Sequence, residues 1–166
     1  MINKDLIDKL NFLFEQKDRF LDYDGLVVQF KKKEGALTKH LDMIKSKSNL
    51  SLPPEYLNFL KYTDGCSLYK YEDIGGFEFL GTRELNQQNE LQKDTYEEDW
   101  DDNLTVFCNV IGDGDFISFR KNPNFIYDIL DCYHDDSPHN WKIIDNSFES
   151  FMEKLIEAKG ERYWLR

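Results

Sequence analysis

Cysteine and histidine are scarce in this chain of 166 residues, which contains three of each. The cysteines, Cys66, Cys108 and Cys132, are odd in number and widely spaced, and no CxxC pair occurs. A zinc ribbon needs closely spaced ligand pairs and a disulfide framework needs an even set, so neither is encoded. We therefore predict small, free thiols in or near the core, and we expect no metal ion and no cofactor.

The chain also lacks any apolar run that approaches the length of a membrane span. The first residues, Met1 to Asp5, have neither the apolar stretch nor the small-residue cleavage site of a signal peptide. Positive charge is in the minority, with 21 Lys and Arg against 32 Asp and Glu and a formal net charge of -11. Such a surface repels nucleic acid and anionic membranes and attracts basic partners. We predict a cytoplasmic protein that binds neither nucleic acid nor membrane.

Aromatic residues are abundant, at 15% of the chain, so a single domain of this length has ample core material. Apolar residues recur at helical spacing in four segments, 5–16, 35–46, 51–64 and 147–160. Ser147 is the predicted N-cap of the last helix. Gly65 and Gly160 stand where a helix can end in the left-handed conformation.

Residues that favour strands dominate the stretch between the last two of these helices. The pattern predicts strands at 76–80, 104–111, 115–120, 125–133 and 141–144. The turn 112–114 joins two of them in a hairpin. A short helix is predicted at 82–91 with Thr82 as its N-cap, an acidic loop at 94–102, and a solvated lysine run at 31–33. This order is typical of an α+β domain with a mostly antiparallel sheet and helices packed around it.

Three short segments, taken in order, resemble the motifs of the SUKH superfamily. Leu52–Leu60 followed by Thr63–Gly65 is similar to the opening motif, although that helix usually ends in Asn-Gly and here ends in Asp-Gly. Gly112–Phe119 is similar to the second motif, a Gly-Asp turn that leads into a central strand. Ser147–Phe151 is similar to the third, a Ser-Phe start of the final helix. The resemblance extends from about residue 35 to residue 159.

The resemblance implies one SUKH-like domain over residues 1–166, with a core at 35–160 and an N-terminal helical extension at 1–34. It implies no catalytic residues, hence a protein that is not an enzyme. Bacterial members resemble immunity proteins encoded beside toxins, many of them nucleases. The implied function is therefore binding and neutralisation of a cognate, basic toxin domain. A regulatory adaptor with an endogenous partner is the alternative, and a small hydrolase that uses Cys132 and His134 is the rival from another class.

One segment, Asp131–Asp136 with His139 nearby, combines the residue types of a metal site. In a strand, however, alternate residues point to opposite faces, and His40 is the only other histidine. A polar loop after a strand is the favoured interpretation. Cys132 and His134 would share a face, but a nucleophile also needs an orienting third group and an oxyanion-stabilising device, which the sequence does not supply.

The acidic run at 94–102 is the strongest candidate for a partner-binding site. Both a solvated loop and a protein interface are compatible with a charge run of this kind. Two large aromatic residues lie within it, and Tyr and Trp are typical interface anchors, while carboxylates steer a basic partner. A nuclease site is basic because it holds phosphates, so an acidic loop can occupy it. The predicted partner-binding residues are Tyr96, Glu97, Glu98, Asp99, Trp100, Asp101, Asp102, Asp135 and Asp136.

Overall fold

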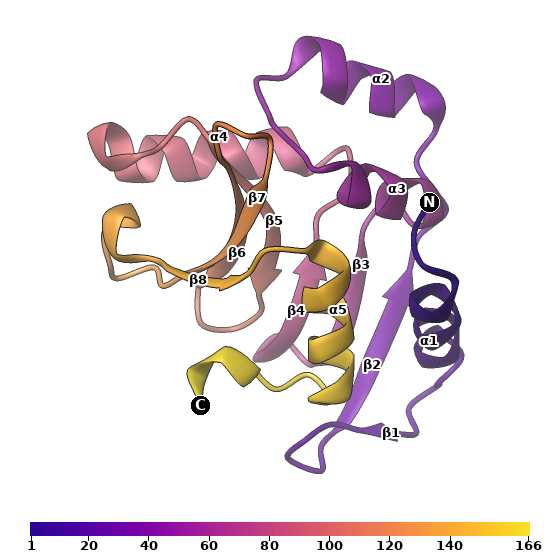
Figure 1. Ribbon diagram of the computed structural model, residues 1–166. Helices are drawn as coiled ribbons and strands as arrows, with labels where there is room; N and C mark the ends of the chain where they lie inside the picture. The colour runs from indigo at the N-terminus through magenta and orange to yellow at the C-terminus, as the bar shows by residue number, and fades with distance from the viewer.

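The computed structural model describes residues 1–166 and has an eight-stranded antiparallel sheet with five α-helices packed around it (Figure 1). The strands follow one another in space in the same order as in the sequence, from β1 to β8. Each strand pairs with its predecessor in antiparallel fashion, through a short turn in some cases and around inserted helices in others. The predicted α+β fold with an antiparallel sheet is confirmed. None of the helices is both long enough and apolar enough to cross a membrane.

The α-helices are α1 (Lys4–Phe14), α2 (Thr38–Lys47), α3 (Pro54–Tyr62), α4 (Leu85–Tyr96) and α5 (Phe148–Glu157). The strands are β1 (Phe20–Leu21), β2 (Val27–Lys32), β3 (Cys66–Tyr71), β4 (Gly75–Phe79), β5 (Leu104–Val110), β6 (Phe116–Lys121), β7 (Tyr127–Cys132) and β8 (Lys142–Asp145). Three short 3₁₀ turns complete the chain, namely η1 (Glu97–Asp99), η2 (Pro138–Asn140) and η3 (Tyr163–Leu165).

Most predicted helices and the central hairpin are confirmed. The helices expected at 5–16, 35–46, 51–64 and 147–160 correspond to α1, α2, α3 and α5. Ser147 caps α5, because its side-chain oxygen accepts a hydrogen bond of 3.3 Å from the backbone N–H of Ser150. The β5–β6 turn contains Gly112 at φ 101°, and a Cβ there would lie 2.4 Å from the carbonyl oxygen of Ile74. Only glycine fits this approach.

Three strands, β1, β2 and β3, were not predicted from the sequence. The lysine run at 31–33, expected to be a solvated stretch, belongs largely to β2, which pairs with β3. Only Val28 of β2 is fully buried, so the strand lacks the alternation of apolar and polar residues that would predict it. In β3 the alternation is broken by an irregularity between Leu68 and Tyr71, where Tyr69 has a φ of 53°. A bulge of this kind removes the period of two on which a strand prediction depends.

The expected N-terminal helical extension at 1–34 is correct only for α1. Residues 20–32 form β1 and β2 instead, and β2 joins the main sheet through β3. Its hydrogen-bonding partner lies about 35 residues further along the chain, which local sequence cannot indicate. The division into an extension and a core at 35–160 stays a prediction.

Thr82 is not a helix N-cap, which corrects the prediction for the 82–91 segment. Its backbone N–H and hydroxyl donate to the carboxylate of Asp64 at 2.6 and 2.8 Å, and α4 begins three residues later at Leu85. The helix also runs further than predicted, to Tyr96. Residues 94–102 are therefore not one acidic loop but the last turn of α4, the η1 turn and a short connection to β5.

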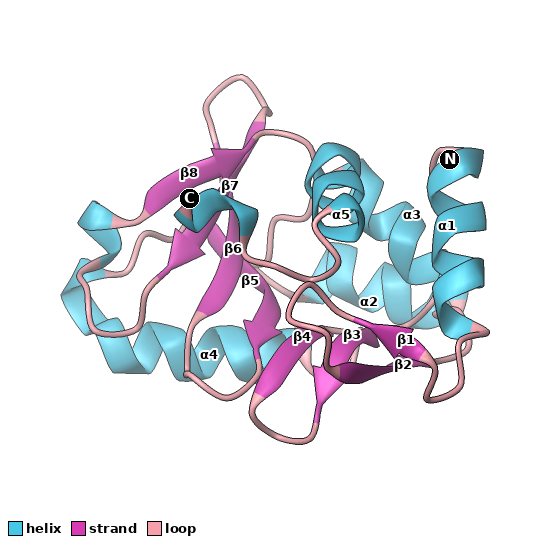
Figure 2. Cartoon of the chain, turned by 90° about the horizontal axis from the view of Figure 1, so that it is seen from below, coloured by secondary structure: helices cyan, strands magenta, loops and turns pink.

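Helices cover both sides of the central strands, with α4 and α5 on opposite faces (Figure 1, Figure 2). Within β6, the Phe116 ring lies 6.3 Å from Tyr96 at the end of α4, whereas the Phe119 ring lies 6.1 Å from Phe148 of α5. Residues three apart in a strand point to opposite faces. The residues that the motifs placed in the core are all buried, namely Leu52, Tyr56, Phe59, Leu60, Phe148 and Phe151.

Candidate protein interface

The acidic segment after α4 has a fixed backbone path. Glu97 takes a left-handed φ of 50° and its backbone N–H donates to the carbonyl oxygen of Lys93, which ends the helix. Glu97–Asp99 then form the η1 turn, and Asp101 accepts hydrogen bonds from the backbone and side-chain amides of Asn103 at 2.9 and 3.0 Å. These contacts direct the chain into β5. The carboxylates are thus presented from a defined turn, not from a loose loop.

The two aromatic residues of this segment pack inward. Tyr96 and Trp100 stack with a centroid separation of 6.2 Å and an interplanar angle of 26°. The centroids of the Tyr96 and Trp100 rings lie 5.1 and 6.3 Å from that of Trp141, and both pairs are in an edge-to-face arrangement. Tyr96 and Trp100 are half-buried and Trp141 is buried. Their main structural role is therefore to hold the acidic turn against the sheet, and only their exposed edges are available to a partner.

The structure brings Asp135 and Asp136 to the same side as the η1 turn. The Tyr96 hydroxyl donates a 3.0 Å hydrogen bond to the carbonyl oxygen of His134, which directly precedes Asp135 in the chain. A second link joins His139 Nε2 to Asp99 Oδ1 at 3.6 Å. Two segments that lie more than 30 residues apart in the sequence therefore form one surface. We call it the acidic ridge, and it consists of Glu97, Glu98, Asp99, Asp101, Asp102, Asp135 and Asp136.

The acidic ridge carries more free charge than paired charge. Glu97 and Glu98 are exposed and form no ion pair. Asp102 pairs with Lys93 at 2.8 Å, but the Asp102 side chain is 82% exposed, so solvent screens the interaction. Asp136 differs, because its Oδ1 accepts from the backbone of Ser137 at 2.8 Å and helps to shape the loop. The exposed carboxylates can therefore meet cations of a partner.

Sequence reasoning missed a cluster of charged side chains beside the ridge. Arg162, from the C-terminal tail, donates hydrogen bonds to Asp113, Asp115 and Asp131 at 2.8, 2.9 and 2.9 Å. Asp115 Oδ1 also lies 2.7 Å from His134 Nδ1. The cluster joins three distant parts of the chain, namely 113–115, 131–134 and Arg162, so no local pattern could have indicated it. It anchors the loop that carries the second half of the acidic ridge.

The same contacts shift the pKa values of this cluster. Burial would raise the pKa of Asp115, but hydrogen bonds from the backbone and ring of His134 and from Arg162 outweigh burial, and the pKa lies below its ordinary value. The hydrogen bond to Asp115 raises the pKa of His134, and the negative charge of Asp135 adds to this effect. His134 is therefore held in its protonated form to a higher pH than a free histidine.

The His134→Asn variant should lose stability in a pH-dependent way. Because the pKa of His134 is raised in the folded state, its contribution is fully present below the unfolded pKa, at about pH 6.5, and is lost as pH rises through the folded value. The gap in melting temperature between wild type and variant should therefore be widest in mildly acidic buffer and should shrink toward alkaline pH. Thermal unfolding across this range measures the gap, and a gap that is constant with pH would contradict the assignment.

The structure brings together neither the Cys132–His134 pair weighed from the sequence nor a cluster of metal ligands. The three cysteines are free and buried, as predicted. Burial raises the pKa of the Cys132 thiol, whose Sγ contacts the carbonyl oxygen of Leu130 at 3.6 Å. The His134 ring instead contacts Asp115, so the two residues do not form a nucleophile–base pair. No group of three or more His, Cys, Asp or Glu side chains is arranged to hold a metal ion.

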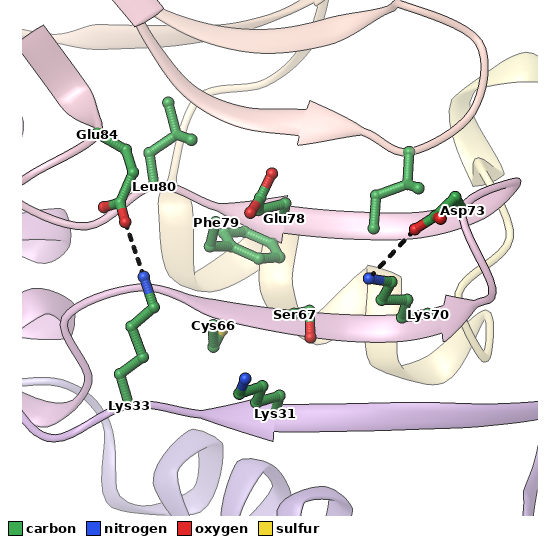
Figure 3. A pocket seen from close by; sticks show the side chains of 11 residues that line it. Lys31, Lys33, Cys66, Ser67, Lys70, Asp73, Glu78, Phe79, Leu80 and Glu84 are labelled. Carbon is green, nitrogen blue, oxygen red and sulfur yellow. Dashed lines mark hydrogen bonds and ion pairs between the residues drawn. The ribbon is translucent and has the colours of Figure 1, made fainter. Parts of the chain in front are cut away.

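Among several hollows on the surface, two are lined by clusters of charged side chains. One of about 290 Å³ lies over β2, β3 and β4 and is lined by three lysines and three acidic side chains (Figure 3). Two of these lysines are paired within the chain, Lys33 with Glu84 at 2.8 Å and Lys70 with Asp73 at 3.5 Å. Equal numbers of both charges give this hollow no preference for an anion. The other, of about 800 Å³, lies between the C-terminal tail and β8, directly beside the Arg162 cluster.

Comparison with known proteins provides two matches. A family model described as the SMI1 / KNR4 family (SUKH-1) matches residues 35–154, from the segment before α2 into α5. The chain is also 26% identical over 139 residues to the "Uncharacterized protein YobM" of Bacillus subtilis (strain 168). That alignment covers 78% of this chain and 70% of the relative. The family match includes strands β3 to β8 and every residue of the acidic ridge.

Proposed function

Because the chain belongs to the SMI1 / KNR4 family (SUKH-1), we propose that it is an immunity protein that binds a cognate bacterial toxin domain and neutralises it without catalysing a reaction. The toxin domain is basic, and the complex forms in the cytoplasm of the cell that makes the immunity protein. Family membership supports this function, since the bacterial members it resembles act beside toxins. The toxin-binding surface is the acidic ridge.

The observation that carries the proposal is the joining of two acidic segments into one surface by the Tyr96 hydroxyl and the aromatic cluster beneath it. A preformed surface of largely exposed carboxylates needs little ordering when a partner binds. Long-range attraction between this surface and a basic partner accelerates encounter. A nuclease that holds phosphates has a basic active site, and the carboxylates of Glu97, Glu98 and Asp99 can occupy it in place of the nucleic acid.

The test combines rescue in cells with binding in solution. The candidate toxin domain encoded beside this gene is expressed in a sensitive host with and without the wild-type chain, and with the variant Glu97→Lys/Glu98→Lys/Asp99→Lys. We expect the wild-type chain to restore growth and form a stable complex. The variant should associate at least about 10-fold more slowly at low salt, because the steering charge is reversed. Stopped-flow or surface plasmon resonance measures the association rate.

A matched control separates the ridge from net charge. The variant Asp8→Lys/Glu15→Lys/Asp42→Lys reverses three exposed carboxylates outside the ridge, so both triple variants move the net charge from -11 to -5, two charges per reversal. Only the ridge variant should associate slowly. If both variants associated equally slowly with the toxin domain, the acidic ridge would not be the binding surface, but the immunity function would stand. Absence of both rescue and complex would contradict the immunity function and favour an adaptor with an endogenous partner.

A further inference from the structure

The turn between β6 and β7 presents two adjacent apolar side chains to solvent. Phe125 is 75% exposed, more than any other large aromatic or aliphatic side chain except the N-terminal methionine, and Ile126 is 54% exposed. Exposed apolar residues that occur singly need no explanation. Here two residues that are adjacent in the chain form the tip of one hairpin. The two strands of that hairpin, β6 and β7, bury most of their apolar side chains.

The backbone of this tip is unusual for the residue that occupies it. Phe125 has a left-handed φ of 59°, a conformation that is rare for bulky side chains and that Gly or Asn adopts at lower cost. Hydrogen bonds hold the turn closed, from the Asn122 N–H to the Ile126 oxygen at 2.8 Å and from the Phe125 N–H to the Asn122 oxygen at 3.0 Å. A strained residue that the fold does not bury is a candidate for function.

The tip is tied to the end of the acidic ridge. The backbone N–H of Lys121, at the start of the turn, donates to the carbonyl oxygen of Asn103 at 3.0 Å. Asn103 in turn donates to Asp101, a member of the ridge. The Lys121 ammonium lies 4.5 Å from the centroid of the Phe125 ring, so one face of the ring carries a cation. Apolar and acidic contacts are thus available side by side at this end of the sheet.

We infer that Phe125 and Ile126 insert into an apolar pocket on the same basic toxin domain that the acidic ridge binds. This inference rests on the proposed function and adds a second contact to it. The ridge governs how fast the partners meet, whereas a desolvated aromatic anchor governs how slowly they separate. A lipid surface is a poorer occupant, because the hydrogen bonds through Asn103 bring the acidic ridge close to the tip and because anionic headgroups repel a net charge of -11.

The variant Phe125→Asn tests the inference, because it should weaken binding to the toxin domain without lowering the stability of the isolated protein. Asn tolerates the left-handed conformation, so the melting temperature of the isolated variant should stay equal to that of the wild type or rise. Its complex with the toxin domain of the rescue assay should dissociate about 30-fold faster, as expected for loss of an interface hot spot. The association rate should change little. Phe12→Asn is the control, since Phe12 is 57% exposed on α1, outside both contacts, and its complex should dissociate at the wild-type rate.

Each outcome separates this inference from the function on which it rests. If Phe125→Asn dissociates at the wild-type rate while the ridge variant still associates slowly, the inference is wrong and the immunity function stands. If the wild-type chain binds no toxin domain, both are overturned. A variant that melts several degrees lower would assign Phe125 a structural role instead. Binding of the wild-type chain to phosphatidylcholine–phosphatidylglycerol vesicles, lost in Phe125→Asn, would overturn the inference in favour of a lipid surface.

Discussion

Replacing Arg162 by alanine is expected to lower the free energy of unfolding by about 3 kcal/mol, the cost of leaving buried carboxylates without their counter-charge. The Arg162 side chain is 19% exposed, and two of its partners, Asp115 and Asp131, are only 4% and 12% exposed. Water cannot replace the guanidinium at these carboxylates without opening the site. Burial already raises the pKa of Asp131, so its charged form depends on Arg162. Urea denaturation at neutral pH measures the loss.

Two control variants make this prediction specific. Arg162→Lys keeps the charge but cannot direct two nitrogens at separate carboxylates, so we expect a smaller loss than for alanine. Arg166→Ala removes an arginine that is 68% exposed and pairs with Glu161, and it should change stability little. If Arg162→Ala unfolds within about 1 kcal/mol of the wild type, the cluster is solvated and does not anchor the loop. Removal of Arg162 should also release the segment that carries Asp135, because Arg162 holds Asp115 and Asp115 in turn holds His134.

Replacing Tyr56 by alanine is expected to lower the free energy of unfolding by about 4 kcal/mol, as for large aromatic residues removed from a close-packed core. Tyr56 has no exposed surface, and its ring lies between 5.1 and 5.5 Å from four other rings, those of Phe59, Phe107, Phe119 and Phe148. These rings join α3 and α5 to the sheet. Urea denaturation compares the variant with the wild type, and a loss below about 2 kcal/mol would show that the core collapses into the space.

Tyr56→Phe separates the hydroxyl from the ring. The hydroxyl donates to the carbonyl oxygen of Leu80 at 2.6 Å and also lies 3.1 Å from that of Phe107. Removing it leaves a buried carbonyl without its donor, which should cost about 1–2 kcal/mol. Tyr23→Phe provides the control, because Tyr23 is 50% exposed and its hydroxyl can be replaced without burying an unpaired group. The aromatic position of the opening motif is thus explained by core packing and by one hydrogen bond.

Part of the candidate site could be predicted from the sequence. Carboxylates next to Tyr96 and Trp100, and a second acidic pair after β7, are visible as composition. The sequence suggested that the two aromatic residues face a partner, whereas their rings lie mostly against Trp141. Side chains of this size pack wherever apolar surface is nearby, and nothing local indicated that Trp141 would be that surface. Whether the remaining edges touch a partner stays a prediction.

The Arg162 cluster and the Phe125 tip could not be predicted. Arg162 meets carboxylates from the β5–β6 turn and from β7, and such a set is assembled only when the C-terminal tail crosses this part of the sheet. Phe125 follows a predicted turn and begins the strand predicted at 125–133, and nothing in that pattern indicated an exposed tip. Exposure results from the left-handed backbone at that residue, which composition does not indicate for phenylalanine.

The sequence by itself determined the α+β order, the helices α3 and α5, the β5–β6 hairpin and the acidic character of the segments at 97–102 and 135–136, because each depends on local periodicity, turn residues or charge. Tertiary structure decided the rest. It added β1, β2 and β3, whose strand character depends on pairing with one another. It also moved the start of α4 by giving Thr82 a partner in Asp64. It also joined two acidic segments into one ridge. These features depend on contacts between distant residues, whose free energies exceed the weak local preferences of the segments that make them.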